Sequence, residues 1–291
     1  MKWALSVAMV PPEDLAELVQ VAEEVGFDAV SLPDSVFFPE QVSGDYPFTS
    51  DGERMWAPET PMPDPVVAMA ALAAVTRRIR FQTSVLKLPL RDPLLLAKQL
   101  ASLAVMSGDR VSLGVGLSWI PEEFRFTGTE MRTRGARTDE AIEILRLVCG
   151  GNGPQWVEFH GRHHDFDRLM VAPAPTTPVP ILVGGHSEAG LRRAASLGDG
   201  WISANKPLAE LEPDLARLTE LRREAGRGDE PFAVWVSPVG VSDLDGFRNL
   251  AKAGVTGVYF APWRLYGHGL ADHATRLESV RRFADEVISL Y

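Results

Sequence analysis

Short apolar runs alternate with amphipathic stretches along almost the whole chain. Residues 12–25, for example, place apolar side chains at three- and four-residue intervals, which predicts a helix that ends at Gly26. The apolar runs predict strands at 3–9, 29–32, 79–86, 111–116, 181–183, 201–203, 232–237 and 257–260. The amphipathic stretches predict helices at 12–25, 64–76, 93–106, 137–149, 187–197, 209–225, 243–252 and 272–289.

These predicted strands and helices alternate strictly, eight of each. The strands are short and apolar on both faces, as parallel strands covered by helices must be. An open doubly wound sheet would meet this pattern, but eight units in 291 residues favour a (β/α)8 TIM barrel in the α/β class. No linker divides the chain, so we predict a single domain over residues 1–291, with insertions after strand 2 and before strand 5.

The first insertion, residues 33–63, combines turn-forming residues with many aromatic ones. A connection this long in a compact domain is usually a functional lid or disordered, and its aromatic content argues against disorder. We expect it to close over the site and to line the substrate space with Phe37, Tyr46, Phe48 and Trp56. The second insertion, 150–179, contains a predicted hairpin.

Composition narrows the function classes. A net charge of −10 argues against electrostatic binding of nucleic acid. No segment reaches the roughly 18 apolar residues of a membrane helix, and the first apolar run is too short for a signal peptide. The single cysteine, Cys149, excludes an internal disulfide and fits a reducing compartment. We therefore expect a cytoplasmic protein that acts on a small molecule.

The stretch from Pro180 to Ser203 carries the clearest functional pattern. A predicted strand meets Gly184 and Gly185, and a helix with Ser187 as its N-cap follows directly. Glycines at such a turn let backbone N–H groups approach a ligand, and the helix directs its positive dipole end at the same place. This arrangement predicts a phosphate site, with a tight turn without a ligand as the alternative.

Further polar and ionisable residues follow the other predicted strands, and TIM barrels have their active sites at these carboxyl ends of the strands. They include hydroxyls, one carboxylate and lysines, but no hydrolytic triad and no cluster of carboxylates. His160, His163 and His164 have the wrong spacing for one metal centre, so we expect no metal. Gly114 and Gly116 lack the third glycine of a dinucleotide fingerprint. A flat aromatic ligand with a phosphate tail suits this set best.

Four long segments together resemble the bacterial luciferase-like oxidoreductases, most closely the branch that uses the deazaflavin coenzyme F420. They read AEEVGFDAVSLPD (22–34), TRRIRFQTSVLKLPLRDPLLLAKQLASLAVMSGDRVSLGVG (76–116), RGARTDEAIEILR (134–146) and PILVGGHSEAGLRRAASLGDGW (180–201). The resemblance covers the chain from Leu5 to Trp201 and is loose beyond it. It implies a (β/α)8 barrel, in agreement with the alternation of strands and helices.

The resemblance also implies roles for individual residues. It places a non-prolyl cis peptide at Ser84–Val85, behind the central ring of the cofactor, and matches Asp34 to an acidic residue near the polar edge of that ring. A plain turn-forming role is the alternative for Asp34. The cofactor-binding residues expected from the resemblance and the strand ends are Asp34, Thr83, Ser84, Val85, Lys87, Gly116, Ser118, Trp119, Gly184, Gly185, His186 and Ser187.

Two positions depart from the F420-dependent sugar-phosphate dehydrogenases. Ser35 stands where they have a histidine, and Trp119 stands where they have a glutamate. In those dehydrogenases the histidine and the glutamate are the acid–base residues for oxidising an alcohol. The resemblance therefore does not imply alcohol oxidation for this chain. Asp34, Ser35 or an ordered water would then supply a proton.

Three functions follow as hypotheses. The first is an F420-dependent oxidoreductase, in which hydride passes between the deazaflavin C5 and a small organic substrate. The second is a monooxygenase that uses O2 and reduced FMN from a separate reductase, and the third is a non-catalytic barrel that binds either cofactor. We expect F420 to bind more tightly than FMN, because Lys87, Arg91 and Lys206 follow strand ends and its tail is more anionic. A homodimer is a further expectation.

Overall fold

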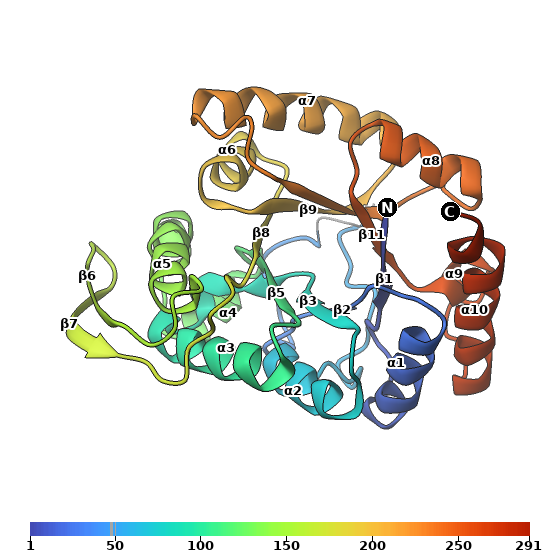
Figure 1. The fold of residues 1–291 in the computed structure, drawn as a ribbon, viewed down its shortest axis with the longest axis horizontal. Coiled ribbons are helices and arrows are strands. Elements are labelled where there is room, and N and C mark those ends of the chain that lie inside the picture. Colours follow the sequence, from blue (N-terminus) through green and yellow to red (C-terminus); the bar gives the residue numbers. More distant parts are fainter. Residues whose placement is uncertain (47–48, 50) are drawn as a thin grey trace.

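The computed structural model describes residues 1–46, 49 and 51–291, and its strands close into a parallel barrel (Figure 1). Around the ring the strands are β1 (Lys2–Ser6), β2 (Ala29–Leu32), β3 (Arg80–Thr83), β5 (Val111–Gly116), β8 (Ile181–Gly184), β9 (Gly200–Lys206), β10 (Ala233–Pro238) and β11 (Gly257–Phe260). Each strand pairs in parallel with the next, and the pairing of β11 with β1 completes the ring. The (β/α)8 barrel predicted from the sequence is confirmed.

In the described part of the chain, eight helices surround the barrel, one after each strand position (Figure 1). They are α1 (Leu15–Glu24), α2 (Pro65–Val75), α3 (Pro93–Ser107), α5 (Arg134–Cys149), α6 (Glu188–Leu197), α7 (Leu208–Glu224), α8 (Leu244–Lys252) and α10 (His273–Glu286). Side chains of Asp64, Asp92 and Asp272 cap the first N–H groups of α2, α3 and α10. Within the described residues, no helix combines the length and apolar character required to cross a bilayer.

The third predicted strand, 79–86, is interrupted. A cis peptide between Ser84 and Val85 separates β3 from a two-residue strand, β4 (Leu86–Lys87), and both pair with β5. The cis peptide lies at the pair that the family resemblance indicated. Strand β1 ends at Ser6, earlier than predicted, whereas β9 extends to Lys206.

The sequence pattern did not reveal several short elements. These are α4 (Pro121–Phe126), α9 (Pro262–Leu265) and the 3-10 turns η1 (Pro12–Asp14), η2 (Leu88–Leu90), η3 (Met131–Thr133) and η4 (Ile288–Leu290). One or two turns contain too few residues for an apolar period to be recognised. The predicted hairpin is present as antiparallel β6 (Trp156–His160) and β7 (Asp165–Met170), which project beyond α5 (Figure 1).

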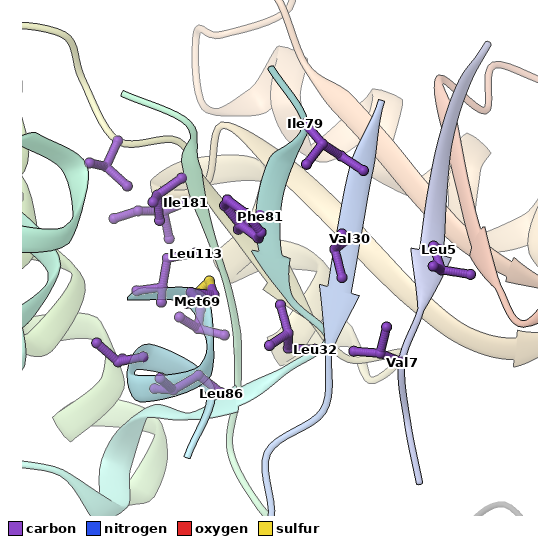
Figure 2. Close-up of a cluster of buried hydrophobic side chains, with 14 of the residues drawn as sticks. Leu5, Val7, Val30, Leu32, Met69, Ile79, Phe81, Leu86, Leu113 and Ile181 are labelled. Atoms are coloured by element: carbon purple, nitrogen blue, oxygen red, sulfur yellow. The ribbon is translucent and has the colours of Figure 1, made fainter. Parts of the chain in front are cut away.

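The apolar core has two layers. The outer layer fills the space between strands and helices, and Figure 2 shows part of it, including Leu5, Val30, Phe81 and Leu113 of the strands and Met69 of α2. The inner layer lies within the barrel and consists of Ala4, Ala29, Leu182, Ile202, Trp235 and Tyr259. Ile202 and Tyr259 also line the cavity at the carboxyl ends of the strands, so this layer closes the barrel beneath the site.

Candidate cofactor and substrate site

A cavity of about 860 Å³ lies at the carboxyl ends of the barrel strands. It brings together most of the residues predicted from the sequence: Asp34, Tyr46, Trp56, Ser84, Val85, Lys87, Gly116, Ser118, Trp119, Gly184, Gly185, His186 and Ser187. Ser35, Phe37 and Thr83 do not line it, and Phe48 lies outside the described residues. Thr83 is buried behind the wall and donates a hydrogen bond to the Gly114 carbonyl at 2.6 Å.

The glycine turn after β8 has the geometry of a phosphate cradle. Gly185 has a φ of +122°, and a Cβ placed there would point into open space with only the Gly190 Cα near it, at 3.7 Å. The Trp201 indole donates to the Gly185 carbonyl at 2.8 Å, which fixes the turn. Ser187 caps α6 by accepting from the Gly190 N–H at 3.2 Å. The residues present therefore fit a phosphate group at the start of α6.

Three ionisable side chains adjoin this turn. His186 Nδ1 lies 2.9 Å from Asp214 Oδ2, and the Lys206 ammonium donates to the same oxygen at 3.1 Å. The His186 ring also packs edge-on against Trp201. The carboxylate of Asp214, on α7, thus holds both His186 and Lys206 at the side of the turn.

The Val85 side chain lies against the glycines at the ends of the neighbouring strands β5 and β8. A Cβ at Gly116 would lie 2.5 Å from Val85 Cγ2, so residue 116 must lack a side chain for this bulge to form. Gly114 and Gly116 thus allow β5 to pack closely against Thr83 and Val85. This packing role accounts for the two glycines without a dinucleotide-binding motif. Ser84 and Val85 form a wall against which a flat ring can lie.

Asp34 is fully engaged by neighbouring groups. Its oxygens accept from Arg91 Nη1 at 2.7 Å and Arg91 Nη2 at 2.9 Å, and the Lys87 backbone N–H donates at 2.8 Å. The side chain of Asp34 is only 1% exposed. Burial alone would lower the pKa of Arg91, but its hydrogen bonds and charge interaction with Asp34 raise that pKa above the ordinary value. This pair anchors β4 beneath the cavity.

Glu123 of α4 is a site residue that sequence reasoning missed. Its side chain is fully buried and forms an ion pair with Lys87, while the Ser118 hydroxyl donates to its other oxygen at 2.6 Å. Lys87 and Ser118 line the cavity, so the buried carboxylate fixes two wall residues at once. Glu122 beside it is only half-buried, and the sequence alone gives no signal that separates the two glutamates.

The long loop after β2 supplies an aromatic wall. Tyr46 packs edge-on against Trp56, with ring centroids 5.3 Å apart, and against Trp119 of the β5 loop at 5.5 Å. Ser43 donates from its hydroxyl to Glu122 at 2.7 Å, which fastens the loop to α4. Phe37 instead packs on Phe126, away from the cavity.

All three cations expected to attract an anionic cofactor tail have carboxylate partners. Lys87 pairs with Glu123, Arg91 with Asp34, and Lys206 with Asp214. Their pairing removes much of the charge argument for F420 over FMN. Within the described residues, no three His, Cys, Asp or Glu side chains are grouped to hold a metal ion.

Comparisons with known proteins agree with this geometry. The family model described as luciferase-like monooxygenase matches residues 2–246. An uncharacterized protein of Mycobacterium tuberculosis is 39% identical over 292 residues, covering 99% of both chains. An F420-dependent glucose-6-phosphate dehydrogenase of Amycolatopsis mediterranei is 28% identical over 280 residues, covering 95% of this chain and 78% of the relative.

Solved structures share the fold at lower sequence identity. An F420-dependent secondary alcohol dehydrogenase in complex with an F420–acetone adduct superposes with a TM-score of 0.76 and 18% identity, covering 100% of this chain and 99% of the other. A monooxygenase from Streptomyces bottropensis gives 0.75 and 21%, covering 100% of each chain. At these identities the likeness concerns the fold alone. Because the family model matches most of this chain, residues 2–246, the chain belongs to the luciferase-like monooxygenase family.

Proposed function

We propose that this protein is an F420-dependent oxidoreductase that transfers a hydride between the deazaflavin and a small organic substrate. The observation that carries the proposal is the similarity, over 95% of this chain, to a relative named as an F420-dependent dehydrogenase. The open, positive-φ turn at Gly185 supports it, because a cofactor phosphate can approach backbone N–H groups there.

In this proposal the chain contributes binding and water exclusion more than strong acid–base chemistry. Gly184, Gly185 and Ser187 would hold the phosphate, and Ser84–Val85 would support the ring. F420 would supply the hydride chemistry when bound. The Tyr46 and Trp56 wall would keep water from the reacting atoms.

We propose a positioning role for Asp34 in place of proton transfer. Both of its oxygens are paired with Arg91, and it holds the Lys87 backbone. Ser35 does not line the cavity, so its geometry lends no support to a proton-donating role. A proton for the substrate would then come from an ordered water or a cavity hydroxyl.

A monooxygenase that uses reduced FMN is the second candidate. The carboxylate partners of Lys87, Arg91 and Lys206 favour this candidate, because a site with little excess positive charge gains less from the longer anionic tail of F420 than we expected from the sequence. A separate reductase would supply the reduced flavin. For either function we propose that residues 1–291 form a single domain and that the protein is cytoplasmic. The homodimer stays a prediction.

Stopped-flow mixing of protein-bound, reduced cofactor with enones or with air tests these functions. Reoxidation by an enone with formation of the saturated product supports the oxidoreductase. Reoxidation by O2 with oxygenated product supports the monooxygenase. Reoxidation by neither, with tight binding of the cofactor, would leave a non-catalytic binding protein and contradict the proposal.

A further inference from the structure

Among the described residues that line the cavity, four have acidic or basic side chains: Asp34, Lys87, His186 and Arg264. The first three are committed to partners within the protein, namely Arg91, Glu123 and Asp214. Arg264 makes no salt bridge with any carboxylate of residues 1–46, 49 and 51–291. It is therefore the cavity's free cation within this part of the chain.

Arg264 lies in α9, directly after β11, where the chain follows the last barrel strand. Its Nη2 lies 3.7 Å from the Met9 sulfur, on the loop after the neighbouring strand β1. A thioether is a weak acceptor, so this contact leaves the guanidinium donors available. Arg264 is thus an exposed residue that lines the cavity and has no carboxylate partner among the described residues.

The place of Arg264 separates it from the glycine turn. The turn follows β8, and two strands, β9 and β10, lie between β8 and β11 around the ring. A cofactor phosphate held at Gly185, with its ring against Ser84–Val85, would extend over the β8, β5 and β3 ends of the barrel. Arg264 and Met9 lie over the β11 and β1 ends, on the side left for a second molecule.

The cavity that Arg264 lines also has aromatic walls, among them Tyr46. Burial raises the pKa of the Tyr46 phenol, and the positive charge of Arg264 partly opposes this shift. Tyr46 in turn packs against Trp56 and Trp119. A ligand in this cavity therefore meets the aromatic surfaces of Tyr46, Trp56 and Trp119 together with the positive charge of Arg264.

We propose that the substrate of this site is a small organic carboxylate with a flat, apolar body, whose carboxylate is bound by Arg264. The inference rests on the proposed function, because it assumes that the cofactor fills the β8 side. A guanidinium forms two parallel hydrogen bonds with a carboxylate. With one free cation among the described residues that line the cavity, a monoanion is matched better than a phosphate dianion.

Calorimetric titration of the F420-loaded protein with cinnamate, with neutral cinnamamide and with phenyl phosphate tests this assignment. Wild type should bind cinnamate more tightly than cinnamamide, and added salt should weaken the binding of the two anionic ligands but not that of cinnamamide. Arg264→Gln should weaken cinnamate binding about ten-fold, as for the loss of one hydrogen bond to a charged group, and leave cinnamamide binding within about two-fold. Arg264→Lys should fall between, because it keeps the charge but loses the planar fork.

Arg132→Gln is the matched control, since Arg132 lies on η3 with an 83% exposed side chain paired to Glu130 and does not line the cavity. Equal losses for cinnamate and cinnamamide in Arg264→Gln, no loss for either, or no binding of cinnamate to wild type would overturn the proposal. Tighter binding of phenyl phosphate than of cinnamate would overturn the choice of a carboxylate.

Cofactor absorbance, recorded for each variant, separates this inference from the proposed function. If neither F420 nor FMN binds wild type, the proposed function fails, and the same titrations on the cofactor-free protein still decide the role of Arg264. If the cofactor binds wild type and Arg264→Gln equally but carboxylate selectivity does not depend on Arg264, only this inference fails.

Discussion

Substitution of Gly185 by valine is expected to abolish cofactor binding and leave the barrel folded. The structure separates the two effects. A Cβ at residue 185 would meet only Gly190 Cα, at 3.7 Å, which is an ordinary contact and no clash. The folding cost therefore comes from the φ of +122°, which a β-branched residue adopts only with strain of about 1–3 kcal/mol.

For a domain of this size each kcal/mol lowers the melting temperature by about 2–4 °C, so we expect a fall of roughly 2–12 °C. The effect on binding should be larger. The valine side chain would occupy the space through which a phosphate approaches the turn and the first N–H groups of α6. Loss of two charge-assisted hydrogen bonds, at about 1.5–3 kcal/mol each, weakens binding by at least about 100-fold.

Gly254→Val provides the matched control. Gly254 also has a positive φ, +97°, and a Cβ at this residue would have no other atom within 4 Å, but it precedes β11 at the opposite end of the barrel. Melting temperature and cofactor affinity, measured on the same samples, should show similar destabilisation in both variants and loss of affinity only at position 185. Wild-type affinity in folded Gly185→Val protein would refute the phosphate site at this turn.

Two further substitutions probe the charge pairs. Glu123→Gln leaves Lys87 with no carboxylate partner in a buried site, so we expect a loss of about 3 kcal/mol or more in the free energy of unfolding by urea. Glu122→Gln should cost much less, because Glu122 is only half-buried and a Gln oxygen can still accept from the Ser43 hydroxyl. Equal losses for the two variants would contradict the buried pair. Hydrogen bonding to Arg217 lowers the pKa of Glu188 from 4.5 to about 2, so this carboxylate stabilises the fold above pH 4.5 and loses that contribution as the pH falls toward 2. The stability difference between wild type and Glu188→Gln should therefore shrink across that interval, and a constant difference would show that the pairing contributes nothing.

The sequence was sufficient to predict the barrel because its parallel strands and covering helices leave a regular apolar alternation. The glycine turn was recognisable for a similar reason, since strand, glycines, N-cap and helix are adjacent in the chain. The cis peptide at Ser84–Val85 could be expected only from the family resemblance, because nothing in the local residue types requires it.

The charge pairs could not be predicted, because their partners are far apart in sequence. Lys87 and Glu123 are 36 residues apart, and Asp34 and Arg91 are 57 apart. The sequence placed the cations at the strand ends correctly but could not show that each was already neutralised. Arg264 was missed because it follows a strand in the part of the chain where the family resemblance is loose.

Equilibrium titration of the purified protein with F420 and with FMN, followed by cofactor absorbance at moderate salt, tests the central claim most directly. We predict saturable binding of both cofactors and loss of F420 binding in Gly185→Val. We also predict a smaller dissociation constant for F420, on the similarity to a relative named as an F420-dependent dehydrogenase. A dissociation constant for FMN equal to or smaller than that for F420 would contradict the assignment as an F420-dependent enzyme.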